Sequence, residues 1–165
     1  MIDASEFLTW LEQYEVGADV LEEALTGLPD SLLQHRPHPD KWSIQEIVSH
    51  LVDTELVMTY RIRTVMAEGK GALAAFDQDR WVDALMGSQQ PVSLSVSTIR
   101  QLRAWQSYAF RQLLAQDRLA LLTKTGTHAV NGEMSVFEIL QKTVSHLHHH
   151  VRQIESSKDA ALKDS

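Results

Sequence analysis

The sequence predicts an all-α protein, a four-helix bundle with one long crossover connection. Apolar residues recur at three- and four-residue spacing in four separate stretches of roughly 20 residues, which is the period of a helix with one buried face. Segments containing proline or glycine separate these stretches, and no stretch alternates apolar and polar residues as a half-buried strand would. Four amphipathic helices of this length favour a bundle around a common core.

The first predicted helix covers residues 4–26, where Glu and Asp alternate with apolar residues at helical spacing. Gly27 suits the position just past its end, because glycine adopts a left-handed backbone at little cost. Prolines then make residues 28–40 a loop, since proline cannot continue a helix.

A capping box marks the start of the second helix, because the Ser43 hydroxyl can accept from the backbone of Glu46 while the Glu46 carboxylate reaches back. This helix is expected to end before Gly69 and to hold His50 toward or beside the core. Glu55 lies about 140° around the helix from His50, so we expect it to pair at the surface.

The remaining elements follow the same signals. Residues 69–92 are irregular, with one short helix at about 77–86, and a connection of this length is typical of a crossover or a functional lid. A third helix is expected from about Ser95 to Asp117 with Trp105 and Tyr108 on its inner side. Residues 119–133 form a loop that could include an extended piece.

A second capping box, Ser135–Glu138, starts the fourth helix, which is expected to run to about Glu155. Residues 1–155 then form a single domain, and residues 156–165 form a short polar tail that is expected to fray.

Composition restricts the function. The 165 residues carry a net charge of −7 and no Lys/Arg-rich block, which argues against a nucleic-acid partner. No signal peptide or membrane-spanning stretch is apparent, so a soluble, cytoplasmic protein is expected. Because there is no cysteine, a metal would have to be held by His and carboxylates, which suits zinc, nickel, iron or manganese better than copper(I).

Four of the eight histidines cluster near the C-terminus. His146 and His150 are four residues apart, so their imidazoles leave the same side of a helix one turn apart, as a pair of metal ligands does. They lie on the shoulder of the apolar stripe, whereas His148 and His149 lie off the ligand line and are expected not to bind. The alternative for the pair is a solvated helix face.

A metal centre needs a third ligand, and His50 is the preferred one. His35, His38 and His128 compete, but all three lie in predicted loops, which hold ligands less rigidly. A single inward-leaning histidine can also be a hydrogen-bonded core residue, and a bundle without metal remains an alternative.

Three segments resemble the DinB-like superfamily, the damage-inducible or bacillithiol-transferase-like group of metal-binding four-helix bundles. They are Lys-Trp-Ser-Ile-Gln-Glu-Ile-Val-Ser-His-Leu-Val-Asp-Thr-Glu at 41–55, Gly-Glu-Met-Ser at 132–135, and His-x-x-His-His-x-x-Gln-Ile at 146–154. The resemblance covers residues 4–155. It implies a divalent metal, commonly nickel or zinc, held by His50, His146 and His150.

The resemblance also implies homodimers and one of two activities. Characterised relatives include thiol S-transferases, which use bacillithiol, mycothiol or similar thiols on small electrophiles, and metal-dependent hydrolases. A non-catalytic, stress-associated metal-binding module is the third reading. A polar-lined pocket beside the metal would favour an enzyme, and a metal sealed by packed side chains would favour the module.

Four further residues could serve the site. Asp53, one turn beyond His50, could accept a hydrogen bond from a ligand or act as a base, or could be a solvated carboxylate. Gln153, one turn beyond His150, could hydrogen-bond a ligand or pack in the interior. Trp42 and Trp81 are interpreted as core and lid packing in preference to a substrate cage.

Overall fold

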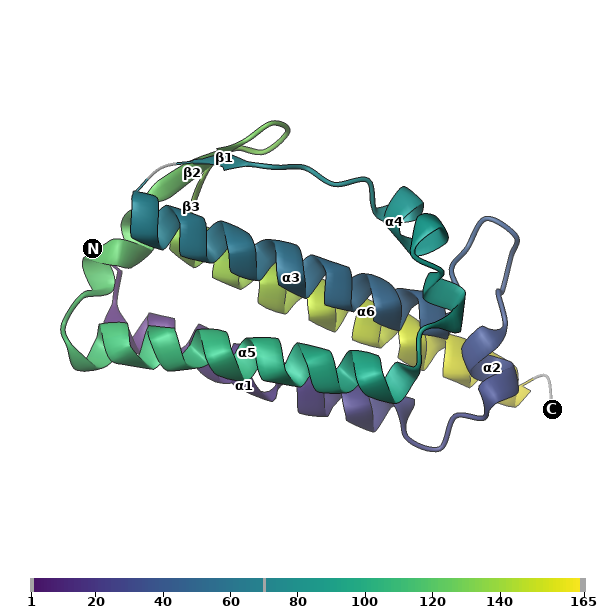
Figure 1. Ribbon diagram of the computed structural model, residues 1–165. Helices are drawn as coiled ribbons and strands as arrows, with labels where there is room; N and C mark the ends of the chain where they lie inside the picture. The colour runs from purple at the N-terminus through teal and green to yellow at the C-terminus, as the bar shows by residue number, and fades with distance from the viewer. Residues whose placement is uncertain (1, 70, 164–165) are drawn as a thin grey trace.

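Four long helices form the body of the computed structural model, which describes residues 2–69 and 71–163 (Figure 1). The long helices are α1 (Ala4–Leu25), α3 (Ile44–Glu68), α5 (Val92–Ala115) and α6 (Val136–Lys163). The shorter elements are α2 (Asp30–Gln34), β1 (Ala72–Leu73), α4 (Gln78–Ala84), η1 (Gly87–Gln89), η2 (Leu119–Thr123), β2 (Thr125–His128) and β3 (Gly132–Ser135). The predicted four-helix bundle is therefore confirmed.

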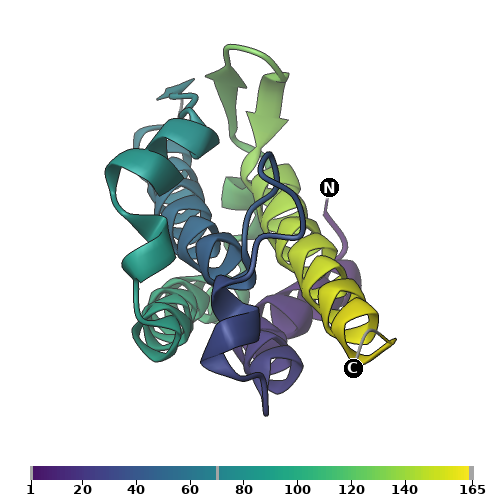
Figure 2. The same ribbon diagram turned by 90° about the vertical axis from the view of Figure 1, so that its right-hand side faces the viewer.

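The bundle has an up-down-down-up order with one crossover. Helices α1 and α6 run in one direction and α3 and α5 in the other (Figure 1). Both α1 and α3 pack against α5 and α6, and Figure 2 shows this arrangement end-on. Because α3 and α5 are parallel neighbours, the chain between them must return along the whole bundle, and β1, an extended segment and α4 do so beside α3 (Figure 1).

Local signals set the helix ends. Ser43 accepts the backbone N–H of Glu46 at 3.2 Å while the Glu46 carboxylate accepts from the Ser43 N–H at 2.8 Å, so the predicted capping box is present. Ser135 and Glu138 form the second box at the start of α6. Gly69 ends α3 with φ of 76°, a left-handed conformation that glycine adopts without steric cost.

Two clusters of apolar side chains fill the space between the helices. Phe7, Tyr14 and Phe110 form edge-to-face aromatic contacts in one cluster, with ring centroids 5.7 and 6.4 Å apart. Aliphatic side chains such as Leu21 and Ile47 form the second, at the end of the bundle where α3 begins. Together they hold α3 and α6 in the register that positions the histidines.

A small sheet, which the sequence did not predict as such, closes one end of the bundle. Strand β1 pairs in parallel with β2, with Ala72 opposite Thr127, and β2 pairs antiparallel with β3. Only the extended piece foreseen within 119–133 corresponds to part of it. Strands of two to four residues are too short to display the two-residue period that identifies a strand in sequence.

Several predicted boundaries and faces were wrong. The short helix α2 was missed, and α6 continues to Lys163 where the prediction ended it near Glu155. Trp105 and Tyr108 are 55% and 68% exposed, not inward-facing. Glu55 is buried, because it meets an arginine from α5 inside the bundle. Helical spacing shows which residues share a face, but the packing of neighbours decides which face is covered.

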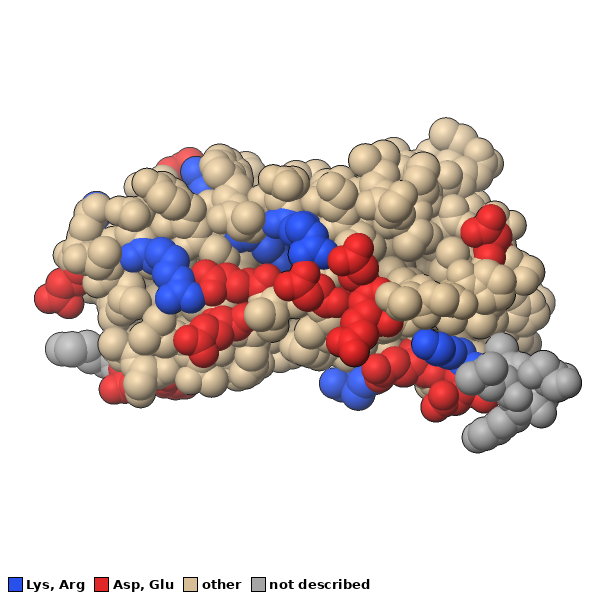
Figure 3. Space-filling view, turned by 90° about the horizontal axis from the view of Figure 1, so that it is seen from below, with Lys and Arg blue, Asp and Glu red and all other residues tan. Residues whose placement is uncertain are grey.

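Ion pairs tie α5 to α1 on the face that Figure 3 shows, where acidic and basic side chains are interleaved. Arg100 contacts Asp19 and Glu22, and Arg111 contacts Glu15. Because these side chains are exposed to solvent, ion pairs of this kind contribute little to the stability of the fold. No helix in the described part of the chain combines the length and apolarity that crossing a membrane requires.

Candidate metal centre

Three histidines from two helices converge inside the bundle. Helix α3 supplies His50, and α6 supplies His146 and His150 from consecutive turns. One ring nitrogen of each lies within 4.8 Å of the others, and the ring centroids are 4.6 to 5.1 Å apart. The structure thus brings together the three residues that the sequence selected, because α3 and α6 are neighbours.

The three imidazoles are held neutral. Burial, reinforced by the other two rings, lowers the pKa of His50 to about 3. Burial and the neighbouring His150 lower the pKa of His146 to about 4. Burial also lowers the pKa of His150, and the hydrogen bond that its ring donates to Gln153 partly offsets this by raising the pKa. At neutral pH each ring therefore keeps a lone pair, the state in which imidazole binds a metal.

Hydrogen bonds orient these lone pairs. Nδ1 of His150 lies 3.0 Å from Oε1 of Gln153, and since that oxygen can only accept, Nδ1 donates its proton. The lone pair of His150 is then on Nε2, the other ring nitrogen. Gln153 makes the contact that the sequence offered as one of its two alternatives, and such a partner fixes the tautomer of a metal-binding histidine.

The protein alone leaves the cluster unsatisfied. Nε2 of His50 lies 3.2 Å from Nε2 of His146 and 3.3 Å from the Thr54 hydroxyl. Nδ1 of His50 is buried with no hydrogen-bond partner among the described residues. Nε2 is thus the nitrogen of His50 that faces the other rings, and three neutral imidazoles whose nitrogens converge fit a divalent ion that takes nitrogen ligands.

Aromatic rings cover the cluster. The half-buried ring of Trp42 lies 4.7 Å from that of His50 and 6.5 Å from that of His150. Phe76, on the extended segment before α4, stacks on His50 with ring centroids 6.4 Å apart, and its ring is tilted against that of Trp81 at 5.0 Å. Trp42 therefore packs on the imidazoles themselves, and Phe76 was missed because nothing in its local sequence relates it to α3.

The remaining predicted residues lie outside the cluster. Asp53 is half-buried, burial raises its pKa, and among the described residues it makes no hydrogen bond to the imidazoles. His148 and His149 do not join the group of possible ligands, as expected. Of the competing histidines, His128 lies on β2 and contacts Arg61 of α3. His35 and His38 likewise do not belong to the group.

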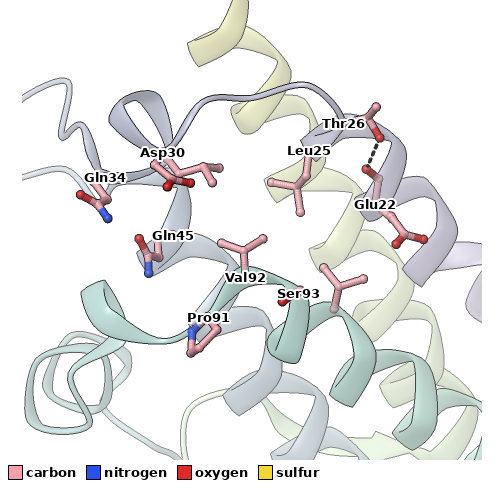
Figure 4. Close-up of a pocket in the computed structure, with 11 residues that line it drawn as sticks. Glu22, Leu25, Thr26, Asp30, Gln34, Gln45, Pro91, Val92 and Ser93 are labelled. Atoms are coloured by element: carbon pink, nitrogen blue, oxygen red, sulfur yellow. Dashed lines mark hydrogen bonds between the residues drawn. The ribbon is translucent and has the colours of Figure 1, made fainter.

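Hollows adjoin the cluster on two sides. One of about 210 Å³ includes Trp42 in its wall, and one of about 330 Å³ includes Phe76 and Trp81. Both walls are more apolar than polar, unlike the polar-lined pocket that would have favoured an enzyme outright. A larger hollow of about 530 Å³ lies between α1, α2, α3 and α5, and Figure 4 shows that its lining contains none of the three histidines.

Known proteins share this architecture. The sequence model of the DinB superfamily matches residues 13–154. A candidate metal-dependent hydrolase of Oceanobacillus iheyensis is 26% identical over 146 residues, which span 88% of this chain and 82% of the relative. Another such relative, from Bacillus cereus, is 24% identical over 149 residues, which span 90% of this chain and 83% of the relative.

The solved structure of YfiT from Bacillus subtilis has the same fold. YfiT is described as a probable metal-dependent hydrolase with an unusual four-helix bundle topology. The two structures align with a TM-score of 0.88 at 20% identity, covering 98% of this chain and 90% of YfiT.

Proposed function

This chain belongs to the DinB superfamily, and we propose that it is a metal-dependent enzyme acting on small molecules, with a divalent ion held by His50, His146 and His150. Nickel and zinc suit three imidazoles best, and iron or manganese would also bind. The observation that supports the metal most is the convergence of three neutral rings, with Nε2 of His50 only 3.2 Å from Nε2 of His146. The names of the relatives support an enzyme over a non-catalytic module. A divalent ion bound there would supply Lewis-acid activation of a water or thiol nucleophile.

The protein side chains around the site would orient and shield it. Gln153 holds the tautomer of His150 through its 3.0 Å hydrogen bond. Trp42 and Phe76 exclude water from His50, which strengthens electrostatic interactions inside the site. Asp53 lies one turn beyond His50 on α3 and its pKa is raised by burial, so we assign it the role of general base if the nucleophile is water.

We favour thiol S-transfer as the reaction, with a low-molecular-weight thiol such as bacillithiol or mycothiol and a small electrophile as substrates. A thiol ionises with a pKa near 8.5, whereas bulk water has a pKa near 15.7, so a thiol needs less help from a base. Within the described residues, no carboxylate is hydrogen-bonded to the cluster, and Glu55 is committed to an ion pair with Arg103. The absence of cysteine means that the thiol would arrive as a cosubstrate.

Hydrolysis is the second reaction to test, because the relatives from Oceanobacillus iheyensis and Bacillus cereus are named for it. Asp53→Asn separates the two. Loss of a general base typically costs about 100- to 10,000-fold in rate, so the variant should slow hydrolysis by about that factor and leave S-transfer within a few-fold of the parent.

The decisive measurement is elemental analysis of untagged protein beside two variants. We expect about one equivalent of metal in the parent and in His149→Ala, which removes an exposed neighbouring ring, and close to none in His50→Ala. Equal metal in all three proteins, or none in the parent after incubation with nickel or zinc, would refute the site.

A screen of metal-loaded protein follows, with bacillithiol, mycothiol and glutathione as thiols and a set of esters and amides for hydrolysis. Thiol-dependent loss of the electrophile that disappears in His50→Ala supports S-transfer. Metal without any turnover would favour the non-catalytic module. We place the reaction in the cytoplasm, where thiols are kept reduced, and the homodimer implied by the resemblance stays a prediction for light scattering.

A further inference from the structure

A mostly apolar cavity of about 330 Å³ lies along α3, beneath the extended segment that leads from β1 to α4. Its apolar wall includes Leu56, Val57, Tyr60, Phe76 and Trp81. The segment that covers it runs beside α3 in Figure 1. Phe76 lines the cavity and also stacks on His50, with ring centroids 6.4 Å apart, so one aromatic ring separates the cavity from the candidate metal centre.

One charged residue enters this cavity wall. Arg61 is only 5% exposed, and its Nη2 donates to the backbone carbonyl of Ala74. Nη1 contacts the sulfur of Met58 at 3.5 Å, a weak acceptor. Nε is buried without a partner, and no described carboxylate lies within ion-pair distance of the guanidinium. A buried arginine normally has an anionic partner. Arg61 has none among the described residues, so its positive charge is uncompensated.

The contact between Arg61 and His128 does not supply the guanidinium with a hydrogen-bond acceptor. Nδ1 of His128 accepts the backbone N–H groups of Val130 and Asn131, each at 3.1 Å, so the proton of the neutral ring is on Nε2. That nitrogen lies 3.2 Å from Nη2 of Arg61, and two donors therefore face each other. Burial and the arginine lower the pKa of His128, which keeps the ring neutral.

We propose that this cavity binds the carboxylate of a small electrophilic substrate through Arg61, with the apolar body of the substrate lying along α3 toward the metal centre. The reaction of this substrate rests on the proposed function, whereas the binding of its carboxylate rests on Arg61 and the cavity alone. Arg61 lies eleven positions after His50, which is about 16 Å along a helix axis and nearly on the same face. The substrate is therefore an extended carboxylic acid.

The atoms balance in the simplest case, a bromoalkyl carboxylic acid whose chain is long enough to span this distance. The thiol sulfur forms a bond to the carbon that carries bromine, the carbon–bromine bond breaks, bromide leaves and the thiol proton passes to solvent. The carboxylate takes no part in bond making and stays on Arg61.

Binding is tested first, by titration calorimetry with phenylbutyrate and its uncharged amide. Parent protein should bind the acid at least about tenfold more tightly than the amide, because a charge-assisted hydrogen bond is roughly twice as strong as a neutral one. Arg61→Gln should remove that preference. Arg63→Gln is the matched control, since Arg63 lies over the exposed ring of Trp105 and outside this cavity. Equal binding of acid and amide by the parent would overturn the inference.

A second variant guards against misfolding of Arg61→Gln. Ala75 lines the cavity and is exposed, so Ala75→Leu should fill the space without disturbing the bundle. It should weaken phenylbutyrate binding at least about tenfold while the circular dichroism spectrum is kept. Unchanged binding in a folded Ala75→Leu protein would locate the acid elsewhere and contradict the inference.

Kinetics then separates the cavity from the metal function. Arg61→Gln should raise KM for the carboxylate bromide at least about tenfold, with kcat and the kinetics of the carboxamide bromide unchanged. If the acid binds to the metal-free His50→Ala protein but no protein turns over the bromide, the proposed reaction fails and the binding site stands. Turnover of both bromides with equal KM would sustain the reaction and overturn the binding site.

Discussion

Helix α3 contributes a side chain to each of two buried polar clusters, only five residues apart. Glu55 faces α1 and α5, where it meets Tyr14 and Arg103, and His50 faces α6, where it meets His146 and His150. The two clusters are similarly buried. They differ in whether the protein by itself satisfies their polar atoms.

The Glu55 cluster is complete. Nε of Arg103 donates to Glu55 at 2.8 Å, with both side chains at most 3% exposed, and the Tyr14 hydroxyl donates to the second carboxylate oxygen. Nη1 of Arg103 donates to the Tyr14 carbonyl at 3.0 Å. A Cβ on Gly17 would lie 1.9 Å from that Nη1, so the glycine makes room for the arginine.

The polar atoms of the histidine cluster are not satisfied in this way. It holds no charged group, its rings are kept neutral by burial, and one nitrogen of His50 is unpaired. A satisfied buried cluster specifies packing, whereas an unsatisfied one that is rich in lone pairs indicates a ligand. Arg61 in its cavity illustrates the same contrast, with donors in place of lone pairs.

The largest effect is expected from breaking the complete cluster. Arg103→Met leaves Glu55 as an unpaired buried charge and should lower the free energy of unfolding by about 3–5 kcal/mol. The double variant with Glu55→Leu should recover most of that loss. Arg111→Met, which removes an exposed partner of Glu15, should cost less than about 1 kcal/mol. Urea unfolding measures all three, and a harmless Arg103→Met would show that the pair is not structural.

A bound metal ion should satisfy the ring nitrogens of the histidine cluster, which would then stabilise the fold as the Glu55 cluster does. At a metal concentration of 1,000 times Kd, the free energy of unfolding should rise by about 4 kcal/mol in the parent and stay constant in His50→Ala. Thermal unfolding with and without a chelator is the measurement. A comparable rise in His50→Ala would assign the metal to another place.

Acid should destabilise the metal-free protein through the same rings. The folded pKa values of His50 and His146, about 3 and about 4, lie below the ordinary value of 6.5, so unfolded chains bind more protons below pH 6.5. Stability is complete above pH 6.5 and falls toward pH 3 by up to about 1.4 kcal/mol per pH unit for each ring. His50→Ala should show a shallower slope between pH 6.5 and about 5, and an equal slope would contradict this account.

The smallest effect is expected from the support of a single ring. Gln153→Ala frees Nδ1 of His150 and should weaken metal affinity by about 10- to 100-fold without loss of the fold. Gln141→Ala, another half-buried glutamine on α6, serves as the control. Competition with a chromophoric chelator gives the affinities, and identical values for the two variants would leave Gln153 a packing residue.

Sequence alone determined the features that depend on local spacing. The helical period and the boxes at Ser43 and Ser135 gave the long helices and two of their starts. Spacing also selected His146 and His150, and the wheel placed His50 where a neighbouring helix could meet it. The structure confirms the helices and their starts, and it places His146 and His150 on one side of α6, because neighbours one turn apart are fixed by the geometry of the helix itself. That these histidines bind a metal stays a prediction.

Tertiary structure alone decided which faces are covered and what they meet. Glu55 is buried because Arg103 of α5 reaches it, and Phe76 covers His50 because the crossover runs beside α3. Arg61 faces a cavity because that same segment bridges over it. None of these contacts has a local signal, since each joins residues brought together only by the packing of the bundle.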